Sequence, residues 1–191
     1  MHIELTDLLR CPADHEESFL VLLPDRMEGR RVLAGHLGCP VCNWSTAWDD
    51  GIPVFGEVEP SDGRPPVDAD DVLTMLGIEG PGGWLVFEGH TGVLAEELRT
   101  RLPDVRCVVV NPPPGVTTSD TVSVLRSPVW PIKRHSARGV VLGPPSSIDR
   151  TAALRSALPG LRIVGEGMPP ALDATQELLA TIDDLWVVLQ H

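Results

Sequence analysis

The chain contains no tyrosine and only three phenylalanines among its 191 residues. No apolar run approaches the ~18 residues that a membrane-spanning helix needs, which excludes membrane insertion. Residues 1–7 lack the basic start and apolar core of a secretion signal, so we expect a cytoplasmic protein with reduced thiols. The sequence motifs of serine-hydrolase elbows, P-loops and zincin helices are missing as well, so those activities lack support.

Basic residues are also scarce, because 15 Lys and Arg face 27 Asp and Glu and give a net charge of −12. This balance opposes nucleic-acid binding by neutralisation of phosphates over the whole surface. One basic cluster, formed by Lys133, Arg134, His135 and Arg138, could hold phosphate, RNA or an acidic partner, but we interpret it as a solvated loop. Gly and Pro occupy 18 and 19 positions, which favours short elements joined by tight turns.

Three of the four cysteines lie in the first quarter of the chain. Cys39 and Cys42 form a C-x-x-C pair, and Cys11 and His15 form a second pair of soft donors. Zinc prefers four tetrahedral sulfur and nitrogen ligands, so these four residues predict a structural Cys3His zinc site with no open position. Cys107 lies alone in an apolar run and is expected to pack as a small apolar side chain.

Two short strands, 19–23 and 30–34, separate the two ligand pairs and predict a hairpin that brings them together. A redox role for Cys39 and Cys42 is an alternative, but redox motifs of this kind open a helix, whereas residues 43–46 read as extended. His36 is an alternative ligand to the histidine of the first pair, although its position before Gly38 favours a strand.

Residues 8–12 (Leu-Leu-Arg-Cys-Pro), 39–42 (Cys-Pro-Val-Cys) and 50–55 (Asp-Gly-Ile-Pro-Val-Phe) give residues 1–57 a resemblance to the Trm112-like zinc-ribbon family. The usual fourth cysteine is replaced here by His15. Members of that family bind and stabilise class I methyltransferases or occur fused to them. The resemblance therefore implies a protein partner or a fused methyltransferase-like domain.

A polar stretch rich in Pro and Gly at 58–67 predicts a linker, so we expect a zinc ribbon at 1–57 and a second domain at 68–191. In the second domain, apolar runs alternate with amphipathic segments, which predicts an α/β fold with a mostly parallel sheet. Strands are expected at 84–87, 105–110, 139–142, 161–164 and 185–189, and helices at 68–77, 92–102, 148–158 and 173–182.

Residues 85–98 resemble the first strand, glycine-rich loop and helix of class I S-adenosylmethionine-dependent methyltransferases, and the resemblance extends over 70–191. It implies a reduced Rossmann-like sheet and a cofactor site at Glu88, Gly89, Gly92 and Asn111. The loop is shorter than the family pattern, however, and has His90 in its centre. Asn111 also replaces the acid that binds the ribose hydroxyls. These departures predict weak or absent binding of S-adenosylmethionine.

Residues 116–125 provide at most a strand where the family has a helix and a strand, so a helical layer is expected to be reduced. We interpret the chain as a zinc-binding, non-catalytic binding or assembly subunit on a degenerate methyltransferase-like fold. Its partner would be another protein or a second copy, with Trp44, Trp48 and Phe55 as candidate anchors. An active methyltransferase with an unorthodox cofactor loop is the alternative, and RNA binding ranks third. Glu88 and His90 have no evident catalytic partner, and capping of the following helix explains them equally well.

Overall fold

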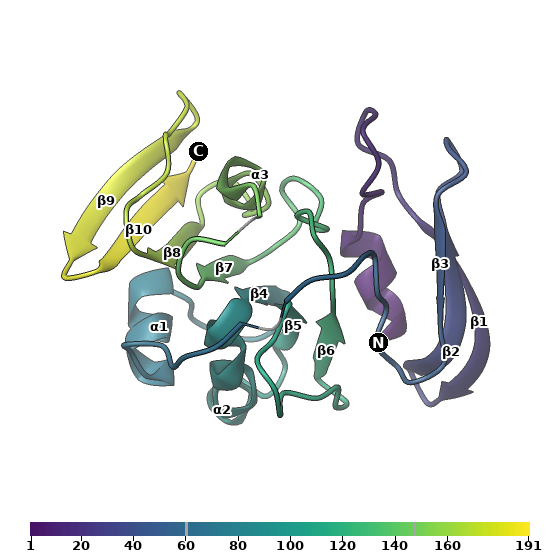
Figure 1. The fold of residues 1–191 in the computed structure, drawn as a ribbon. Helices are drawn as coiled ribbons and strands as arrows, with labels where there is room; N and C mark the ends of the chain where they lie inside the picture. Colours follow the sequence, from purple (N-terminus) through teal and green to yellow (C-terminus); the bar gives the residue numbers. More distant parts are fainter. Residues whose placement is uncertain (60, 147) are drawn as a thin grey trace.

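The computed structural model describes residues 1–59, 61–146 and 148–191, so one position of the predicted linker, residue 60, lies outside the described residues. The chain begins with a 3₁₀ helix, Ile3–Leu8, followed by an antiparallel sheet in the order β1-β2-β3 (Figure 1). Its strands are β1 (Val21–Glu28), β2 (Arg31–Gly38) and β3 (Ser45–Trp48). The predicted hairpin is present, and both of its strands extend further than the apolar runs indicated.

A mixed sheet of seven strands forms the larger part of the molecule. Its strands are β4 (Trp84–Glu88), β5 (Arg106–Val110), β6 (Val122–Leu125), β7 (Gly139–Leu142), β8 (Arg162–Glu166), β9 (Gln176–Ile182) and β10 (Leu185–Gln190). The spatial order is β6-β5-β4-β7-β8-β10-β9, and the first five of these are parallel. Counted from β4, the order is 3-2-1-4-5-7-6, which begins as a Rossmann sheet and ends in an antiparallel hairpin. The expected α/β, mostly parallel fold is confirmed.

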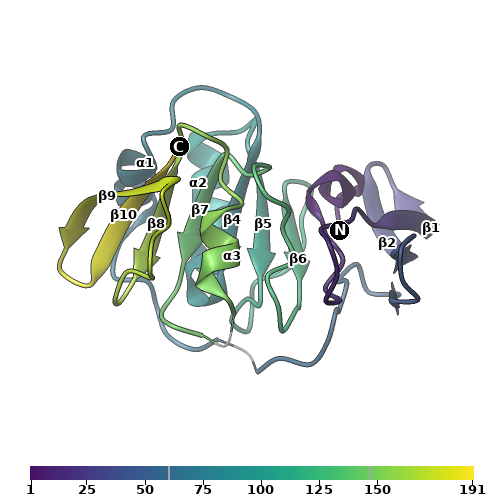
Figure 2. The ribbon, with the colours of Figure 1, turned by 90° about the horizontal axis from the view of Figure 1, so that it is seen from above.

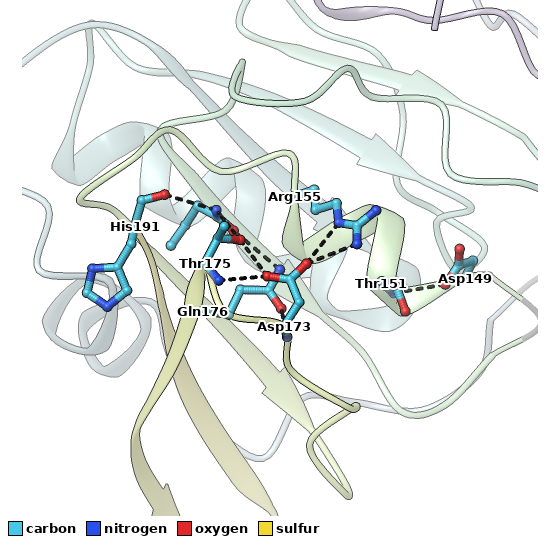
Figure 3. Close-up of polar contacts among 8 residues, drawn as sticks. Asp149, Thr151, Arg155, Asp173, Thr175, Gln176 and His191 are labelled. Atoms are coloured by element: carbon cyan, nitrogen blue, oxygen red, sulfur yellow. Dashed lines mark hydrogen bonds and ion pairs between the residues drawn. The ribbon is translucent and has the colours of Figure 1, made fainter. Parts of the chain in front are cut away.

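The helix predicted at 173–182 is wrong, because residues 176–182 form β9, which pairs antiparallel with β10. Before β9, Asp173 accepts hydrogen bonds from Arg155 (2.9 Å) and from the backbone N–H of Thr175 (2.8 Å) (Figure 3). These contacts fix a turn at the residue expected to begin a helix. The long apolar run of β10 needs a strand neighbour, and this tertiary pairing overrides the local helical pattern.

Helices cover the two faces of the sheet unequally (Figure 2). α1 (Ala69–Leu76) and α2 (Ala95–Arg101) pack on the face that contains Leu85 and Phe87. On the opposite face, α3 (Arg150–Leu154) is the only α-helix within the described residues. The connection from β5 to β6, residues 111–121, is fully described and contains no helix. The expected reduction of the helical layer is therefore visible, and the helices at 92–102 and 148–158 are shorter than expected.

The N-terminal segment packs on the face of the large sheet that carries α3, opposite to the face on which the β5–β6 connection packs. Met1, Leu5 and Leu9 are buried in one apolar cluster with Val86 and Val108 of the sheet. The backbone N–H of His2 donates to Ser123 Oγ of β6 at 2.9 Å. Residues 1–57 and the seven-stranded sheet thus share one hydrophobic core.

A second contact joins the segment after β3 to the β6 edge of the large sheet. Val54 forms a parallel bridge with Arg126, and the backbone N–H of Phe55 donates to the Arg126 carbonyl at 2.7 Å. Trp48 and Phe55 are buried in the shared core, and Trp44 packs edge-on against Phe55 with ring centroids 4.9 Å apart. These three candidate anchors make contacts within the chain.

In the described part of the chain, no helix combines the length and apolar character that crossing a bilayer requires.

Candidate metal centre and the carboxyl edge of the sheet

The four predicted zinc ligands converge at one end of the N-terminal sheet. Cys11 and His15 lie in the loop before β1, and Cys39 and Cys42 lie in the turn directly after β2. Their donor atoms all lie within 4.8 Å of one another. Strand pairing explains this convergence, because Val21 at the start of β1 lies opposite Gly38 at the end of β2.

The distances between donor atoms fit a tetrahedral ion. Cys11 Sγ lies 3.7 Å from Cys42 Sγ, and Cys39 Sγ lies 3.5 Å from His15 Nε2. Zinc–sulfur and zinc–nitrogen bonds of about 2.3 and 2.0 Å at tetrahedral angles place such atoms about 3.8 and 3.6 Å apart. A disulfide would require about 2.05 Å. The cluster therefore has the geometry of a metal site and not of a cystine.

Backbone groups orient these ligands. The N–H groups of Ala13 and Val41 point at Cys11 Sγ (3.5 Å) and Cys39 Sγ (3.4 Å), as expected for sulfurs that carry negative charge. His15 Nδ1 lies 2.6 Å from the carbonyl oxygen of Glu16. When Nδ1 donates its proton there, Nε2 is left as the ligand atom, which is the usual arrangement for a metal-bound histidine.

The thiols of the metal-free cluster differ in acidity. Burial raises the pKa of Cys11 to about 12, whereas backbone N–H groups of Val41 and Cys42 outweigh burial at Cys39 and lower its pKa to about 6. The alternative ligand His36 is exposed and pairs with Asp25 at 3.0 Å. The cluster therefore contains His15 and not His36.

The carboxyl edge, where β4 to β8 end, holds the residues implied by the methyltransferase resemblance. Glu88 closes β4 and is 5% exposed. Its Oε2 accepts a hydrogen bond from the Gly143 N–H at 3.2 Å, which ties β4 to the end of β7. Burial raises the pKa of Glu88, and the nearby Arg150 guanidinium opposes this shift.

His90 lies within a 3₁₀ turn, Gly89–Leu94, and its imidazole is buried at the carboxyl edge. Its Nε2 lies 2.6 Å from Glu166 Oε1 at the end of β8, and its Nδ1 lies 3.3 Å from the carbonyl oxygen of Asp62. Both ring nitrogens thus contact the protein itself. The imidazole joins the linker to β8, and no helix-capping bond from it is present.

Gly92 serves packing. A Cβ atom at this position would lie 2.2 Å from Cγ1 of Val109, so only glycine lets the turn approach β5 this closely. Asn111, after β5, has a φ of 54° and binds one backbone unit with both ends of its amide. Its Oδ1 accepts from the Ser127 N–H and its Nδ2 donates to the Ser127 carbonyl, each at 2.8 Å.

The linker crosses the carboxyl edge: Figure 2 shows the segment between β3 and α1 running along the side to which the strand arrowheads point. Ser61 Oγ would lie 3.0 Å from a Cβ atom on Gly89, so linker and loop are in close contact. A cavity of about 390 Å³ remains beside it. Glu57, Glu59 and Glu88 are among its lining residues.

Sequence reasoning missed Glu166, Ser127 and Arg150, each of which contacts an expected site residue or its neighbour. Arg150 donates from Nη1 to the Glu166 carbonyl at 2.8 Å. No local pattern marks these residues, because each lies far along the chain from its contact. The basic cluster is dispersed as well, since the Arg138 guanidinium binds carbonyls of residues 79–82.

Comparisons with known proteins identify methyltransferases as structural neighbours. No family model and no curated protein matches the chain. A geranyl diphosphate methyltransferase in complex with GPP and sinefungin matches with 19% identity, over 51% of this chain and 42% of that one, with a TM-score of 0.41. A complex between the Haloferax volcanii Trm112 methyltransferase activator and a putative methyltransferase matches with 19% identity, over 51% and 50%, with a TM-score of 0.41.

The antibiotic-resistance methyltransferase Kmr matches with 13% identity, over 70% of this chain and 97% of that one, with a TM-score of 0.44. The matches to the first two structures span half of those chains or less. At these values the comparisons assign neither a fold nor an activity to this chain.

Proposed function

We propose that the chain is a zinc-stabilised, non-catalytic binding or assembly subunit, built from a Trm112-like ribbon at 1–57, a linker at 58–67 and a methyltransferase-like domain at 68–191. One observation carries this proposal: the polar groups at the carboxyl edge are engaged by the protein's own atoms. Asn111 binds Ser127, Glu88 binds Gly143, and His90 binds Glu166 and the linker.

Zinc is the metal that this donor set supports best. Three sulfurs and one imidazole nitrogen suit a tetrahedral ion without redox chemistry, and four protein ligands leave no position for a water to be activated. The ion would crosslink the loop before β1 to the turn after β2. Its role in this subunit is therefore to hold the N-terminal sheet against the shared core.

The Trm112-like part of the proposal is supported by the residues at 8–12, 39–42 and 50–55 and by the way this segment docks. The segment after β3 pairs in parallel with the chain just after β6, so it extends the free edge of the large sheet. The ribbon and the sheet share a core, which fits a fused adaptor whose methyltransferase-like partner is part of the same chain.

Lost catalysis is supported by the internal hydrogen bonds that a cofactor would have to displace at the carboxyl edge. A nucleotide-type ligand at a Rossmann switch point needs backbone approach at the first loop and polar contacts at the end of the second strand. His90 occupies the centre of that loop, and the Asn111 amide is already bonded at both ends. Each lost contact weakens binding by ~1–3 kcal/mol, so two contacts account for roughly a hundredfold or more.

An active methyltransferase is the second candidate, and a specific observation favours it. The cavity of about 390 Å³ lies at the carboxyl edge and includes Glu88 and Asn111 in its lining. A ligand could reach both residues there if the linker moved aside. The two candidates differ in whether S-adenosylmethionine enters this space.

Titration calorimetry with S-adenosylmethionine on the zinc-loaded protein distinguishes them. We expect no binding heat for the wild-type chain at micromolar concentrations, and none for Asn111→Asp, which restores the acid but leaves the linker in place. Micromolar affinity of the wild-type chain, abolished by Gly92→Trp, would favour the active enzyme instead. Circular dichroism of both variants checks that they fold.

A further inference from the structure

The β1-β2-β3 sheet has one face in the core and one face in solvent, and the solvent face is unusually apolar. Leu22 and Leu37 face the core, and the alternate residues Phe19, Val21 and Leu23 face outward. Phe19 is 57% exposed, Val21 43% and Leu23 64%. The solvent face of an antiparallel sheet normally carries polar side chains, so these exposed residues mark a candidate contact surface.

The neighbouring strands add small residues to this surface. Val21 lies opposite Gly38, which lies opposite Ser45, and Leu23 lies opposite His36, which lies opposite Ala47. We name the surface formed by Phe19, Val21, Leu23, His36, Gly38, Ser45 and Ala47 the outer face. Gly38, Ser45 and Ala47 allow a partner to approach the backbone closely, while Phe19, Val21 and Leu23 provide apolar contact area.

Acidic residues flank the outer face along the chain. Glu16 and Glu17 precede Phe19, Asp25 lies within β1, and Asp49 follows β3; all four are exposed. Arg26 donates to the Asp49 backbone carbonyl at 2.8 Å, and His36 pairs with Asp25 at 3.0 Å. Because the rim is acidic and the chain carries a net charge of −12, two copies of this face repel each other and a basic partner is attracted.

We propose that the outer face binds a protein segment that has one apolar stripe bordered by Arg or Lys. This inference rests on the proposed function as a binding subunit, and it names the surface and the chemistry of the partner. Apolar side chains of the partner would cover Val21 and Leu23, and its cations would lie near the acidic rim. The outer face is open for such contact, because residues 1–57 already use their other side to pack on the large sheet.

The opposite end of the molecule supplies a matched control (Figure 1). There, β9 exposes Leu178 at 43% and Ile182 at 58%, at the free edge of the seven-stranded sheet. This surface is similarly apolar but is formed by a different sheet. A probe that responds only to hydrophobicity or to total charge would bind at both ends.

The test uses the full-length, zinc-loaded chain and a fluorescently labelled amphipathic peptide with leucines on one face and arginines along its borders. Binding is measured by anisotropy. We expect the Val21→Ser/Leu23→Ser double variant to weaken binding at least tenfold, and the Leu178→Ser/Ile182→Ser control to change it less than twofold. A peptide with Glu in place of every Arg should bind at least tenfold more weakly than the Arg peptide.

Several results would overturn the inference: no binding of the Arg peptide, equal loss in both double variants, or equal binding of the Glu peptide. A dimer of the wild-type chain that disappears in the Val21→Ser/Leu23→Ser variant would also overturn it, because a second copy would then be the occupant. Zinc content and cofactor titration are measured on the same samples. If the zinc-loaded protein bound neither the cofactor nor the peptide, the outer-face site would be refuted and the proposed function would still hold.

Discussion

Polar side chains from distant parts of the chain meet at both the metal centre and the carboxyl edge. At the metal centre their polar atoms point toward one another, and at the carboxyl edge they point toward other groups of the protein. At the metal centre, four donor atoms converge within 4.8 Å, and backbone N–H groups orient two of the sulfurs. At the carboxyl edge, the side chains of Asn111, Glu88 and His90 each bond to another part of the protein. The first arrangement suits an ion, and the second holds the fold together.

Residue types at a suggestive spacing therefore identify a site only when their unbonded donor or acceptor atoms point at one place. The four predicted Cys3His ligands satisfy this condition because a hairpin brings their loops together. The residues at the carboxyl edge satisfy the spacing of a nucleotide site, but internal partners use their hydrogen-bonding capacity.

The largest expected effect follows from removing a metal ligand. Cys39→Ser should reduce bound zinc from one ion per chain to near zero and cause the N-terminal sheet to unfold. Structural zinc contributes ~10–16 kcal/mol of apparent binding free energy in small zinc domains. Elemental analysis and thermal unfolding of protein purified without chelators measure both effects.

The control for this experiment is Cys107→Ala, because Cys107 is buried in the α2 side of the large sheet, away from the cluster. It should retain one zinc ion. Native unfolding of the Cys39→Ser variant, or a wild-type protein that contains no metal, would contradict the assignment.

The second effect concerns the buried pair at the carboxyl edge. The side chains of His90 and Glu166 are 6% and 12% exposed, so His90→Ala leaves a buried carboxylate without its partner. Breaking such a pair costs ~3–5 kcal/mol, which urea unfolding can measure. The exposed pair of His36 and Asp25 is the matched control, and His36→Ala should cost ~0–1 kcal/mol. Equal losses in the two variants would mean that His90 does not join the linker to the edge.

A third, smaller effect tests whether Gly92 serves packing or a cofactor. A Cβ atom there would overlap Val109, so Gly92→Ala should destabilise the ligand-free protein by ~1–3 kcal/mol. Gly38→Ala is the control, because a Cβ atom at Gly38 meets no atom within 4 Å. If Gly92→Ala left stability unchanged, the close approach of the turn to β5 would not be needed for folding.

The sequence predicted more of the metal centre than of the carboxyl edge, and the reason is physical. Metal ligands are few residue types at narrow spacing, and the hairpin between them is a local structure. The parallel strands are likewise marked by local apolar runs. By contrast, the bonds of Asn111 to Ser127 and of His90 to Glu166 join residues 16 and 76 positions apart, and no local pattern encodes them.

β9 shows the limit of local patterns within the fold itself. Its apolar residues Leu178, Leu179 and Ile182 have the three- and four-residue spacing of a helix, but β10 is a buried apolar strand that requires a neighbour. Similarly, the absence of a helix between β5 and β6 was readable from the length of residues 111–121. That the N-terminal segment would pack on the opposite face, with Met1 and Leu5 in one cluster with Val86, depends on contacts between residues more than 80 positions apart.

The smallest effect contrasts two carboxylates in their response to pH. Hydrogen bonds from Thr175 and the Arg155 guanidinium lower the pKa of Asp173 to about 2, so the unfolded state binds this proton more readily. Stability from Asp173 is therefore complete above about pH 4 and falls as the pH drops toward 2.

Burial raises the pKa of Glu88, so its effect has the opposite sign, and stability falls as the pH rises above 4.5 through the folded-state pKa. Urea unfolding between pH 2 and 8 should show that Asp173→Asn removes part of the acid-side slope, while Glu88→Gln removes part of the loss above pH 4.5. If both substitutions changed the free energy of unfolding in the same pH range, burial at the carboxyl edge would not disfavour the charged form of Glu88. The contrast between an edge closed by internal contacts and an exposed turn would then fail.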